Sequence, residues 1–488
     1  MSRGLGDVYK RQDPRRGYLV MTLTLPLFTF LSMVSKENGI LLPVVIGALE
    51  ITVFSAQRQR YGVLDKRWAG LFLVAPLAII SVYLGRLFFE PNFLEIVPPR
   101  DFSVFERLLT QPRIIVDYLQ NWFIPKLYTT GVFQDHFLKS TGLFTPVSTF
   151  LSIILVIGSL AIAAKVRRRA PLVAAAILFY FANHLLESTV VSLELYFEHR
   201  NYLATALLFV PLVALLWERA SRRVFAIASL ALLLMLGGFT RYSSTVWQSE
   251  EGMVQASAMK APTSVRAQSQ YAMLLFNANM NDEGMRVLDA AIENIPGDQP
   301  ALLMHKLTSE CNMGVLEPAE LEHIAGIVSS IPFDPRMLKI YNEFAKAVVL
   351  QRCPDIRVAD VLPMFVNMLA LPENQDKSSI QYTHIRFLIG YTRLYMGEVN
   401  GAMAEFKESL ASRPGASYAM AMAALFATSG FPAQALELSE IALTQLDTKN
   451  TTTLVGQRAT EADIRAFQET VRAELALPQG ADIPDQDE

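Results

Sequence analysis

The sequence predicts an all-α protein in two parts, a polytopic bundle of about seven membrane-spanning helices followed by an α-solenoid of helical repeats. Composition gives the first reason. The mean hydropathy is +0.28 and charged residues make up 18% of the chain, against roughly 25% in an average soluble domain. Long apolar runs also fill the first half and stop near Thr240, after which the sequence is polar with helical periodicity.

The two ends of the chain differ from the parts between them. Residues 1–12, MSRGLGDVYKRQ, match neither the apolar core of a signal peptide nor the apolar run that follows, and we interpret them as a non-native leader. Residues 478–488 are acidic and contain proline, which predicts a disordered tail. We therefore expect a transmembrane domain at 13–242, with an outer loop at 90–145, and a repeat domain at 243–477.

Seven stretches approach the length of about 20 mostly apolar residues that a membrane-spanning helix needs. They are residues 17–34, 39–55, 68–89, 146–164, 171–190, 202–217 and 224–239. The first, second and sixth are short, so their ends are the least certain.

Basic residues alternate between the loops. They occur before the first span and in every second loop after it, as Arg15, Arg16, Arg58, Arg60, Lys66, Arg67, Lys165, Arg167, Arg168, Arg169, Arg219, Arg222 and Arg223. Because cytoplasmic loops carry the excess of Lys and Arg, these loops are predicted to be cytoplasmic. An odd number of spans then places the repeat domain on the opposite side of the membrane.

Ionisable residues gather in three stretches on the predicted outer face. Such groups are costly at membrane depth and usually face a cavity or one another, which makes them functional candidates. The alternative for a pair at a helix end is that it only reaches water by snorkelling. The candidates are Lys36 and Glu37 after the first span, Asp135 and His136 in the long loop, and His184, Glu187, Glu194, Glu198, His199 and Arg200 between the fifth and sixth spans.

The long outer loop contains a helical pattern of apolar residues that is interrupted by Pro112. The pattern consists of Phe105, Leu108, Leu109, Ile115, Tyr118, Leu119 and Trp122. It predicts an amphipathic helix lying on the bilayer, with Trp122 at the interface. Packing of this helix against the repeat domain is an equal alternative.

The second half contains repeats of about 34 residues. The clearest unit has small, turn, small, aromatic and proline residues at Gly390, Gly397, Ala402, Phe406 and Pro414. Weaker copies contain Ala272, Leu288, Ala291 and Pro296, and then Ala424, Gly430 and Ala435, whereas residues 301–376 are helical but degenerate. Small residues let paired helices approach closely and proline ends the second helix, so we expect a solenoid that binds a peptide or protein.

Several other functions have no support in the sequence. The net charge of −3 and the pI near 6.2 give no basic surface for nucleic acid. Cys311 and Cys353 lack the spacing of a zinc site and are either thiols or one disulfide. His305, His323 and His384 are scattered. The motifs of hydrolases, ATPases and zinc sites are absent, and no cofactor is identified.

Three segments carry a resemblance to a known family. SKENGILLP between two spans, the loop ending GVFQDHF, and HLLESTVVSLELYFEHRNYL before the last spans and repeats resemble the bacterial relatives of the transmembrane and tetratricopeptide-repeat O-mannosyltransferases. These are GT-C glycosyltransferases. The resemblance covers about residue 17 to the end and implies a multi-pass protein of the bacterial inner membrane. It also implies periplasmic tetratricopeptide (TPR) repeats and a polyprenyl-phosphate-linked sugar as donor substrate.

The family pattern places its acidic catalytic motif in the first outer loop, and no outer loop precedes Ser35 here. We expect the N-terminal spans with the catalytic residues to be missing from this sequence, and we name no catalytic base. What remains resembles the donor side, where Arg suits phosphate better than Lys through its two-pronged geometry. The resemblance implies donor-phosphate or sugar contacts for Arg200, Lys36, His199, Glu198, Glu187, Glu37 and Asp135.

Three functions therefore compete. The first is a glycosyltransferase that takes sugar from the lipid-linked donor and modifies a protein or envelope acceptor presented by the repeats. The second is a non-enzymatic, membrane-anchored repeat scaffold for envelope protein assembly. The third is a polysaccharide polymerase or ligase, which also combines many spans with large outer loops. An upstream outer loop with paired acidic residues would favour the first over the second.

Overall fold

The computed structural model describes residues 14–56, 63–90, 93–94, 102–124, 132–191, 193–297, 299–446 and 459–476. Within these ranges every regular element is a helix. The chain divides into two compact units, Met1–Ala261 and Pro262–Glu488, whereas the boundary expected after residue 242 falls inside helix α12. The predicted leader at 1–12, the tail at 478–488, and Arg58 and Arg60 lie outside the described residues.

By length and composition, five helical runs in the described part of the chain could cross a membrane. They correspond to predicted spans one to four and seven. They are α2 (Pro14–Ser35), the run η1–α3–η2 (Glu37–Leu41, Leu42–Leu49, Glu50–Phe54), the run α5–η3–α6–η4 (Lys66–Ala69, Gly70–Val74, Ala75–Arg86, Leu87–Phe89), α8 (Ser148–Val166) and α12 (Arg222–Val246).

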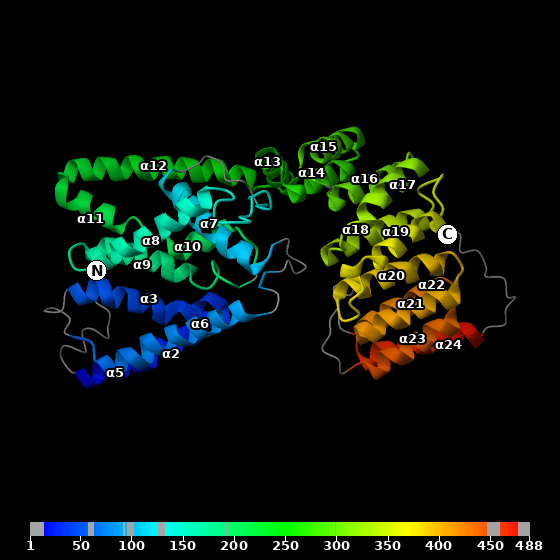
Figure 1. Ribbon diagram of the computed structural model, residues 1–488, viewed down its shortest axis with the longest axis horizontal. Coiled ribbons are helices and arrows are strands. Elements are labelled where there is room, and N and C mark those ends of the chain that lie inside the picture. The colour runs from blue at the N-terminus through cyan, green and yellow to red at the C-terminus, as the bar shows by residue number, and fades with distance from the viewer. Residues whose placement is uncertain are drawn as a thin grey trace, which may run out of the picture. The chain divides into compact units, whose positions relative to one another are not determined.

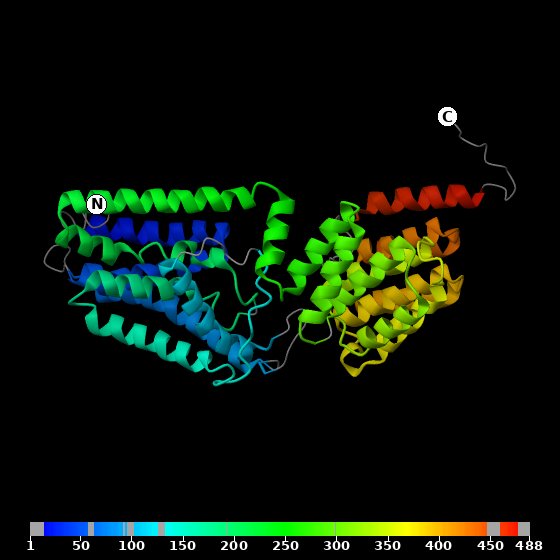
Figure 2. The ribbon, with the colours of Figure 1, turned by 90° about the horizontal axis from the view of Figure 1, so that it is seen from above.

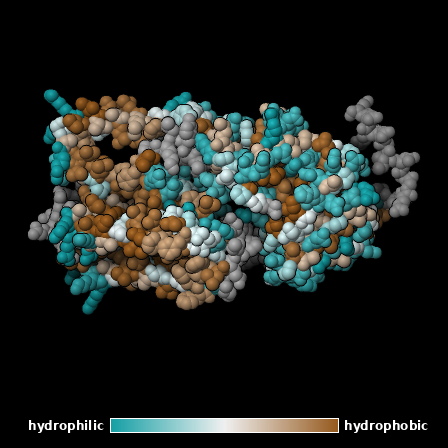
Figure 3. Space-filling model, turned by 45° about the horizontal axis from the view of Figure 1, so that its top comes forward, coloured by the Kyte–Doolittle hydropathy of each residue, from teal (hydrophilic) through white to brown (hydrophobic). Residues whose placement is uncertain are grey.

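The outer surfaces of these helices are apolar. On α12 no residue is buried, and Leu233 and Leu234 are 67% and 68% exposed. Brown, hydrophobic atoms dominate this face of unit 1 in Figure 3, whereas unit 2 shows a mixed surface. A contiguous apolar surface of this extent is unfavourable in water. It suits helices surrounded by lipid.

The fifth and sixth predicted spans differ from the sequence prediction. Helix α9 (Pro171–His184) stops short of residue 190, and the sixth stretch is not continuous. It consists of α10 (Asn201–Ala204), a series of turns and α11 (Val210–Arg219). Pro211 sits in the first turn of α11 and has no N–H to donate to the preceding turn, which is one physical reason why the helix restarts there.

The long outer loop contains one uninterrupted helix, α7 (Val104–Phe123). A capping box begins it, because Glu106 N–H donates to Ser103 Oγ over 3.1 Å and Ser103 N–H donates to Glu106 Oε2 over 2.8 Å. Pro112 interrupts the apolar pattern but not the helix, which continues through this residue. The apolar face packs within unit 1, where Ile114 and Tyr118 are buried.

The helix ends that carry basic residues lie together within unit 1. The start of α2, the start of α5, the α8–α9 turn and the α11–α12 turn all lie at the left-hand end of the unit in Figure 1. The rotated view in Figure 2 agrees for α2 and the α11–α12 turn. This arrangement supports the interpretation that the basic loops share one side of the membrane.

Unit 2 is a succession of paired helices, and α13 (Glu250–Lys260) precedes it in unit 1. The core of unit 2 has two clusters, a small one from Ala272 to Leu302 and a large one from Leu303 to Val471. The helices are α14 (Val265–Asn277), α15 (Asn281–Asn294), α16 (Pro300–Met313), α17 (Pro318–Ser329), α18 (Leu338–Val349), α19 (Val358–Ala370), α20 (Ile380–Tyr395), α21 (Val399–Ser412), α22 (Ala416–Thr428), α23 (Pro432–Thr444) and α24 (Glu461–Ala476), with short 3-10 turns η6 (Pro335–Met337) and η7 (Pro372–Asn374).

The geometry of the clearest repeat matches its sequence signature. A Cβ atom on Gly390 of α20 would lie 2.6 Å from the ring of Phe406 on α21, so only glycine allows this approach. Gly397 turns the chain with φ +81°, and Ala402 and Phe406 are fully buried. Pro414 follows the end of α21. The prediction of TPR-like helical repeats is confirmed.

The weaker repeats show the same features, but in one of them the buried small residue is shifted by one position. Gly284 on α15 lies against the Phe276 ring of α14, where an added Cβ would also come within 2.6 Å. In the last pair the buried small residue of α22 is Ala423, not the predicted Ala424, which is exposed. This repeat is therefore one residue shorter than the 34-residue spacing assumed.

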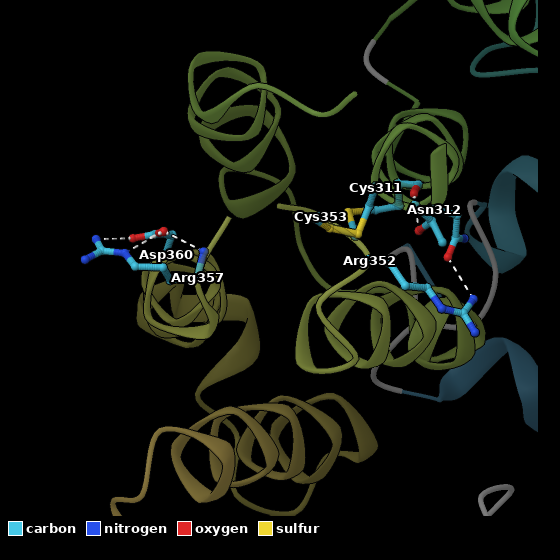
Figure 4. The surroundings of a disulfide bond; sticks show 8 residues. Cys311, Asn312, Arg352, Cys353, Arg357 and Asp360 are labelled. Atoms are coloured by element: carbon cyan, nitrogen blue, oxygen red, sulfur yellow. Dashed lines mark hydrogen bonds and ion pairs between the residues drawn. A yellow bond between two sulfur atoms is a disulfide. The ribbon is translucent and has the colours of Figure 1, made fainter. Parts of the chain in front are cut away.

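A disulfide joins two helices in the degenerate middle of unit 2. Cys311 on α16 and Cys353, just after α18, are bonded and buried, and Figure 4 shows the bridge between these segments. Beside it, Arg352 Nη1 donates to Asn312 Oδ1 over 3.0 Å. Of the two alternatives left open by the sequence, the structure has the disulfide.

Candidate functional site

Unit 1 contains a cavity of about 1290 Å³. Its walls come from α7, the loop before α8, the segment 196–202, α11 and α12. The lining is chemically divided. The polar residues include Asp117, Asn121, Gln134, His136, Glu198, His199 and Asn201, and the apolar ones include Phe209, Leu212, Leu232, Met235, Leu236 and Phe239.

Three side chains on the polar wall form a closed hydrogen-bond network. Tyr196 Oη donates to Asp117 Oδ2 over 2.6 Å, and Asn121 Nδ2 donates to the same oxygen over 3.1 Å. Asn121 Nδ2 also lies 3.1 Å from Tyr196 Oη, which accepts. Burial, with the neighbouring Asp117, raises the pKa of Tyr196 above its usual value, so the phenol keeps its proton.

Helix α7 fixes the segment that precedes η5 (Glu198–Arg200), because side chains of α7 form hydrogen bonds with the backbone of that segment. Tyr118 Oη accepts from Phe197 N–H over 2.7 Å and donates to Phe197 C=O over 2.8 Å. Gln111 Nε2 donates to Leu195 C=O over 3.0 Å. Burial raises the pKa of Tyr118 to about 12, which keeps its hydroxyl available as a donor.

Arg107 is a fully buried cation on the same helix. Its Nε donates to Thr189 C=O over 2.9 Å and its Nη1 to Glu194 C=O over 3.2 Å. Further hydrogen bonds join its guanidinium to the carbonyls of Leu193 and Glu187. Four carbonyls of residues 187–194 thus converge on one guanidinium, which sets the path of this segment.

Glu187 bridges two of the predicted cations. Its Oε1 lies 3.1 Å from Lys36 Nζ, and its Oε2 lies 3.3 Å from Arg200 Nε. The turn after α2, the end of α9 and η5 therefore meet at one carboxylate. We call Lys36, Glu187 and Arg200 the charge cluster. Residues from distant parts of the chain were predicted to share the outer face, and here they are in contact.

The two cations of the charge cluster differ in exposure. The Arg200 side chain is buried, its Nη1 donates to Glu194 C=O over 2.8 Å and to Leu195 C=O over 3.2 Å, and its guanidinium lies 5.3 Å from the centre of the Phe197 ring. Lys36 keeps 52% of its side chain exposed. Of the pair, Lys36 is the more accessible to an incoming anion.

His199 lies at the junction of the cavity and the charge cluster. It lines the cavity together with Glu198, and its ring is 5.1 Å from that of Phe197. Partial burial lowers the pKa of His199, and Lys36 and Arg200 lower it further against the opposing effect of Glu187. His199 is therefore neutral at pH 7 and can both donate and accept a hydrogen bond.

The other two predicted residues lie apart from the charge cluster. Glu37 is exposed in the first turn of η1. Asp135 is also exposed, but it is near enough to His136 to affect its protonation. Burial lowers the pKa of His136, while Asp135 and Asp117 partly oppose that shift. It is His136, rather than Asp135, that lines the cavity.

In the described part of the chain, no group of three or more His, Cys, Asp and Glu side chains is placed to hold a metal ion. Two carboxylates, Asp117 at the cavity and Glu187 in the charge cluster, have other partners. Asp117 accepts from Tyr196 and Asn121, and Glu187 pairs with two cations.

Sequence reasoning missed three residues that build the site, Arg107, Asp117 and Asn121. A signal was present for the first. Arg107 lies 7 and 11 positions before Ile114 and Tyr118, so it falls on the apolar stripe of the helix rather than on its polar face. A charge on that stripe needs buried partners. Asp117 and Asn121 gave no such signal, because polar residues on an amphipathic helix usually face water.

Comparisons with known proteins find little that resembles the chain. No protein-family model matches it, and no curated protein matches it. One similar solved structure is a thermophilic TPR protein of Thermus thermophilus, at 20% sequence identity and a TM-score of 0.26, covering 43% of this chain and 98% of that one. At that TM-score the likeness does not bear on fold or function.

Proposed function

We propose that unit 1 binds a polyprenyl-phosphate-linked sugar, and that the protein belongs to a membrane glycosyltransferase system whose repeats present a protein or envelope acceptor. The observation that carries this proposal is the divided cavity. A polyprenyl-phosphate sugar is amphipathic in the same way, with a polar head on an apolar chain. The volume exceeds the roughly 300–1,000 Å³ of a usual small-molecule site, which leaves room for the head and part of the chain.

The charge cluster supports a place for the phosphate. Lys36 is half exposed at the predicted membrane boundary, and Arg200 offers the two-pronged geometry that suits phosphate oxygens. In this proposal the phosphate competes with Glu187 for the two cations. Glu198 and His199, which line the cavity, orient the head group, and Glu37 and Asp135 have peripheral roles.

The proposed reaction is a displacement at the anomeric carbon. An acceptor hydroxyl attacks C1 of the sugar, the bond from C1 to the phosphate oxygen breaks, and polyprenyl phosphate leaves with the bonding electrons. The hydroxyl proton passes to a general base. We assign no residue of this chain to that last role.

We also propose an inner-membrane location with unit 2 in the periplasm. The grouping of the basic helix ends at one end of unit 1 supports the orientation. The disulfide Cys311–Cys353 supports an oxidising compartment for unit 2, because such bonds are rare in the cytosol and persist in the periplasm. A protein or peptide segment would then bind the repeats.

The proposal is tested by measuring binding of a short-chain polyprenyl-phosphate mannose to the full chain in lipid nanodiscs. Arg200→Lys should weaken binding by about 1.5–3 kcal/mol, because it keeps the charge but loses a charge-assisted hydrogen bond. Lys36→Ala should also weaken it. Arg86→Ala is the matched control, since its side chain is 74% exposed and an exposed ion pair is worth about 0–1 kcal/mol.

Unchanged affinity in Arg200→Lys and Arg200→Ala would remove Arg200 from the donor site and leave Lys36 as the cation. Unchanged affinity in all three variants would remove the charge cluster. If the chain binds no polyprenyl phosphate at all, the second candidate gains, a membrane-anchored repeat scaffold. The specific observation in its favour is the core of unit 2, whose buried residues all belong to that unit.

A further inference from the structure

The hydrogen bonds on the polar wall determine which way the Asn121 amide points. An ionised carboxylate only accepts hydrogen bonds, so the nitrogen of the amide, and not its oxygen, must face Asp117 Oδ2. The same nitrogen donates to Tyr196 Oη. The amide oxygen is consequently turned away from this network. It is buried and has no hydrogen-bond partner.

A second polar atom of a cavity-lining residue is also buried without a hydrogen-bond partner. His136 Nδ1 is buried without a hydrogen-bond partner, and the residue comes from the loop before α8, not from α7. Buried polar atoms in folded proteins are almost always paired, and an exception calls for a ligand, an ion or water at that place. Two such atoms on separate elements both belong to residues that line one cavity.

The chemistry of this wall selects the kind of group that can pair with it. Asn121 Oδ1 and the carboxylates of Asp117 and Glu198 are all acceptors, and neutral His136 supplies one donor and one acceptor. A ligand must therefore present several O–H or N–H donors. The phosphodiester of a lipid-linked sugar has only acceptor oxygens and a negative charge, so the carboxylates would repel it from this wall. It fits only beside the cations.

We propose that Asp117, Asn121 and His136 form a subsite that binds the hydroxyl groups of the donor sugar, separately from the phosphate. This inference rests on the proposed function, which it deepens by assigning the two halves of the head group to different residues. The hydroxyl groups lie against α7, and the phosphate lies toward His199 and the charge cluster. The apolar chain lies along α11 and α12, against Leu232, Leu236 and Phe239.

The test compares two phosphodiester probes of equal charge on the full chain in nanodiscs, a short-chain polyprenyl methyl phosphate as the bare lipid and the same lipid phosphate bearing one sugar from a panel of hexoses and N-acetylhexosamines. We expect at least one sugar to raise affinity over the bare lipid. Asn121→Ala should remove most of that gain, about tenfold for one lost hydrogen bond, while leaving the bare lipid unaffected. His136→Ala tests the same point from another element, without altering the network around Asp117.

Gln120→Ala is the matched control, because Gln120 is exposed on the same helix and should change neither affinity. The subsite is overturned if no sugar adds affinity to the bare lipid, or if Asn121→Ala and His136→Ala weaken both probes equally, as a merely structural role would. Failure of the proposed function looks different. In that case neither probe binds the unmodified chain, which overturns the donor site and the subsite together.

Discussion

Arg107 carries a full positive charge with no surface exposed to solvent. Its hydrogen bonds go to the backbone carbonyls of residues 187–194, among them Thr189 and Glu194. The oriented carbonyl dipoles take the place of water around the guanidinium, and the guanidinium takes the place of backbone partners that this irregular segment lacks. The segment and the helix therefore depend on each other.

Arg107→Ala should destabilise unit 1 by about 3–5 kcal/mol, the cost of removing one partner from a buried ionic arrangement. The reason is that several carbonyls would be left without donors in a buried place. Denaturant unfolding of the full chain in micelles, followed by Trp fluorescence, would measure it. Arg86→Ala should change stability by less than about 1 kcal/mol. If Arg107→Ala behaved like this control, the carbonyls would have other partners and the segment would not depend on α7.

At the residue scale the sequence predicted charged positions better than their partners. Lys36, Glu187 and Arg200 were recognisable because charges next to apolar spans are unusual, and the structure joins them. The sequence did not single out Glu187, rather than Glu198 or Glu37, as the carboxylate that contacts both cations. Contacts of this kind depend on how three separate segments return to one place, which local patterns do not encode.

Among the helices, the broken sixth span is the clearest departure from the sequence pattern. Residues 202–217 are apolar enough for a continuous span, but the helix stops after Ala204 and restarts at Val210. Irregular backbone at membrane depth is tolerated where it is buried in protein or lines a cavity. Tyr202 and Phe209 line the cavity. The break therefore lies at the cavity, where irregular backbone is tolerated. Hydropathy alone does not reveal it.

The repeats, unlike the broken sixth span, could be predicted from the sequence, because their contacts join helices that are neighbours in the chain. Gly390→Ala should destabilise unit 2, since the new methyl group meets the buried Phe406 ring at 2.6 Å. Phe406 is packed against Phe387 and Phe426 and has little room to move. Overpacking costs about 1–3 kcal/mol and helix propensity returns about 1 kcal/mol, so the net loss is up to about 2 kcal/mol.

Thermal unfolding of residues 262–477 expressed alone, which begins at the boundary of unit 2, would measure this effect, because we expect the stacked repeats to fold without the membrane unit. Gly326→Ala is the matched control. Gly326 is exposed within α17, with nothing within 4 Å of an added Cβ, so this variant should gain up to about 1 kcal/mol. Equal shifts for the two variants would contradict the close approach of α20 and α21. Aggregation of the fragment without helix would contradict its independent folding.

The degenerate middle of unit 2 has a cross-link where the repeat pattern is weakest. The two cysteines are 42 residues apart, and closing a loop of that size contributes up to about 4 kcal/mol by restricting the unfolded chain. The double variant Cys311→Ala, Cys353→Ala should therefore lower the denaturant midpoint of the fragment markedly. A reducing agent should destabilise the unmodified fragment and leave the double variant unchanged. An unmodified fragment indifferent to reduction under unfolding conditions would mean that the disulfide does not form.

At the scale of the whole molecule, the contacts of α7 constrain which helices cross the membrane. Helix α7 follows the third predicted span, so the alternation of basic loops predicts that it lies on the outer face. It binds residues 187–197 directly through Arg107, Gln111 and Tyr118. Residues 187–197 must then be on the outer face as well. That requires α9 to cross, although its 14 residues extend only about 21 Å against a hydrocarbon core of roughly 30 Å.

Reporter fusions with alkaline phosphatase, which is active only in the periplasm, would test this topology. Fusions after Arg60, Arg169 and Arg222 should be inactive, and fusions after Phe137 and Tyr242 should be active. These five sites give the same result whether α9 and the broken sixth segment both cross or both stay on the cytoplasmic side, because either arrangement leaves an odd number of spans.

A sixth fusion, after Glu194, distinguishes these two arrangements. It should be active, since Glu194 C=O accepts from Arg107 on the outer helix α7. An inactive fusion at Glu194 would separate α7 from the segment that it binds, and would leave the charge cluster and the polar wall without a common side of the membrane. A cytoplasmic result at Tyr242 would overturn the orientation of the whole chain, and with it the periplasmic location of the repeats.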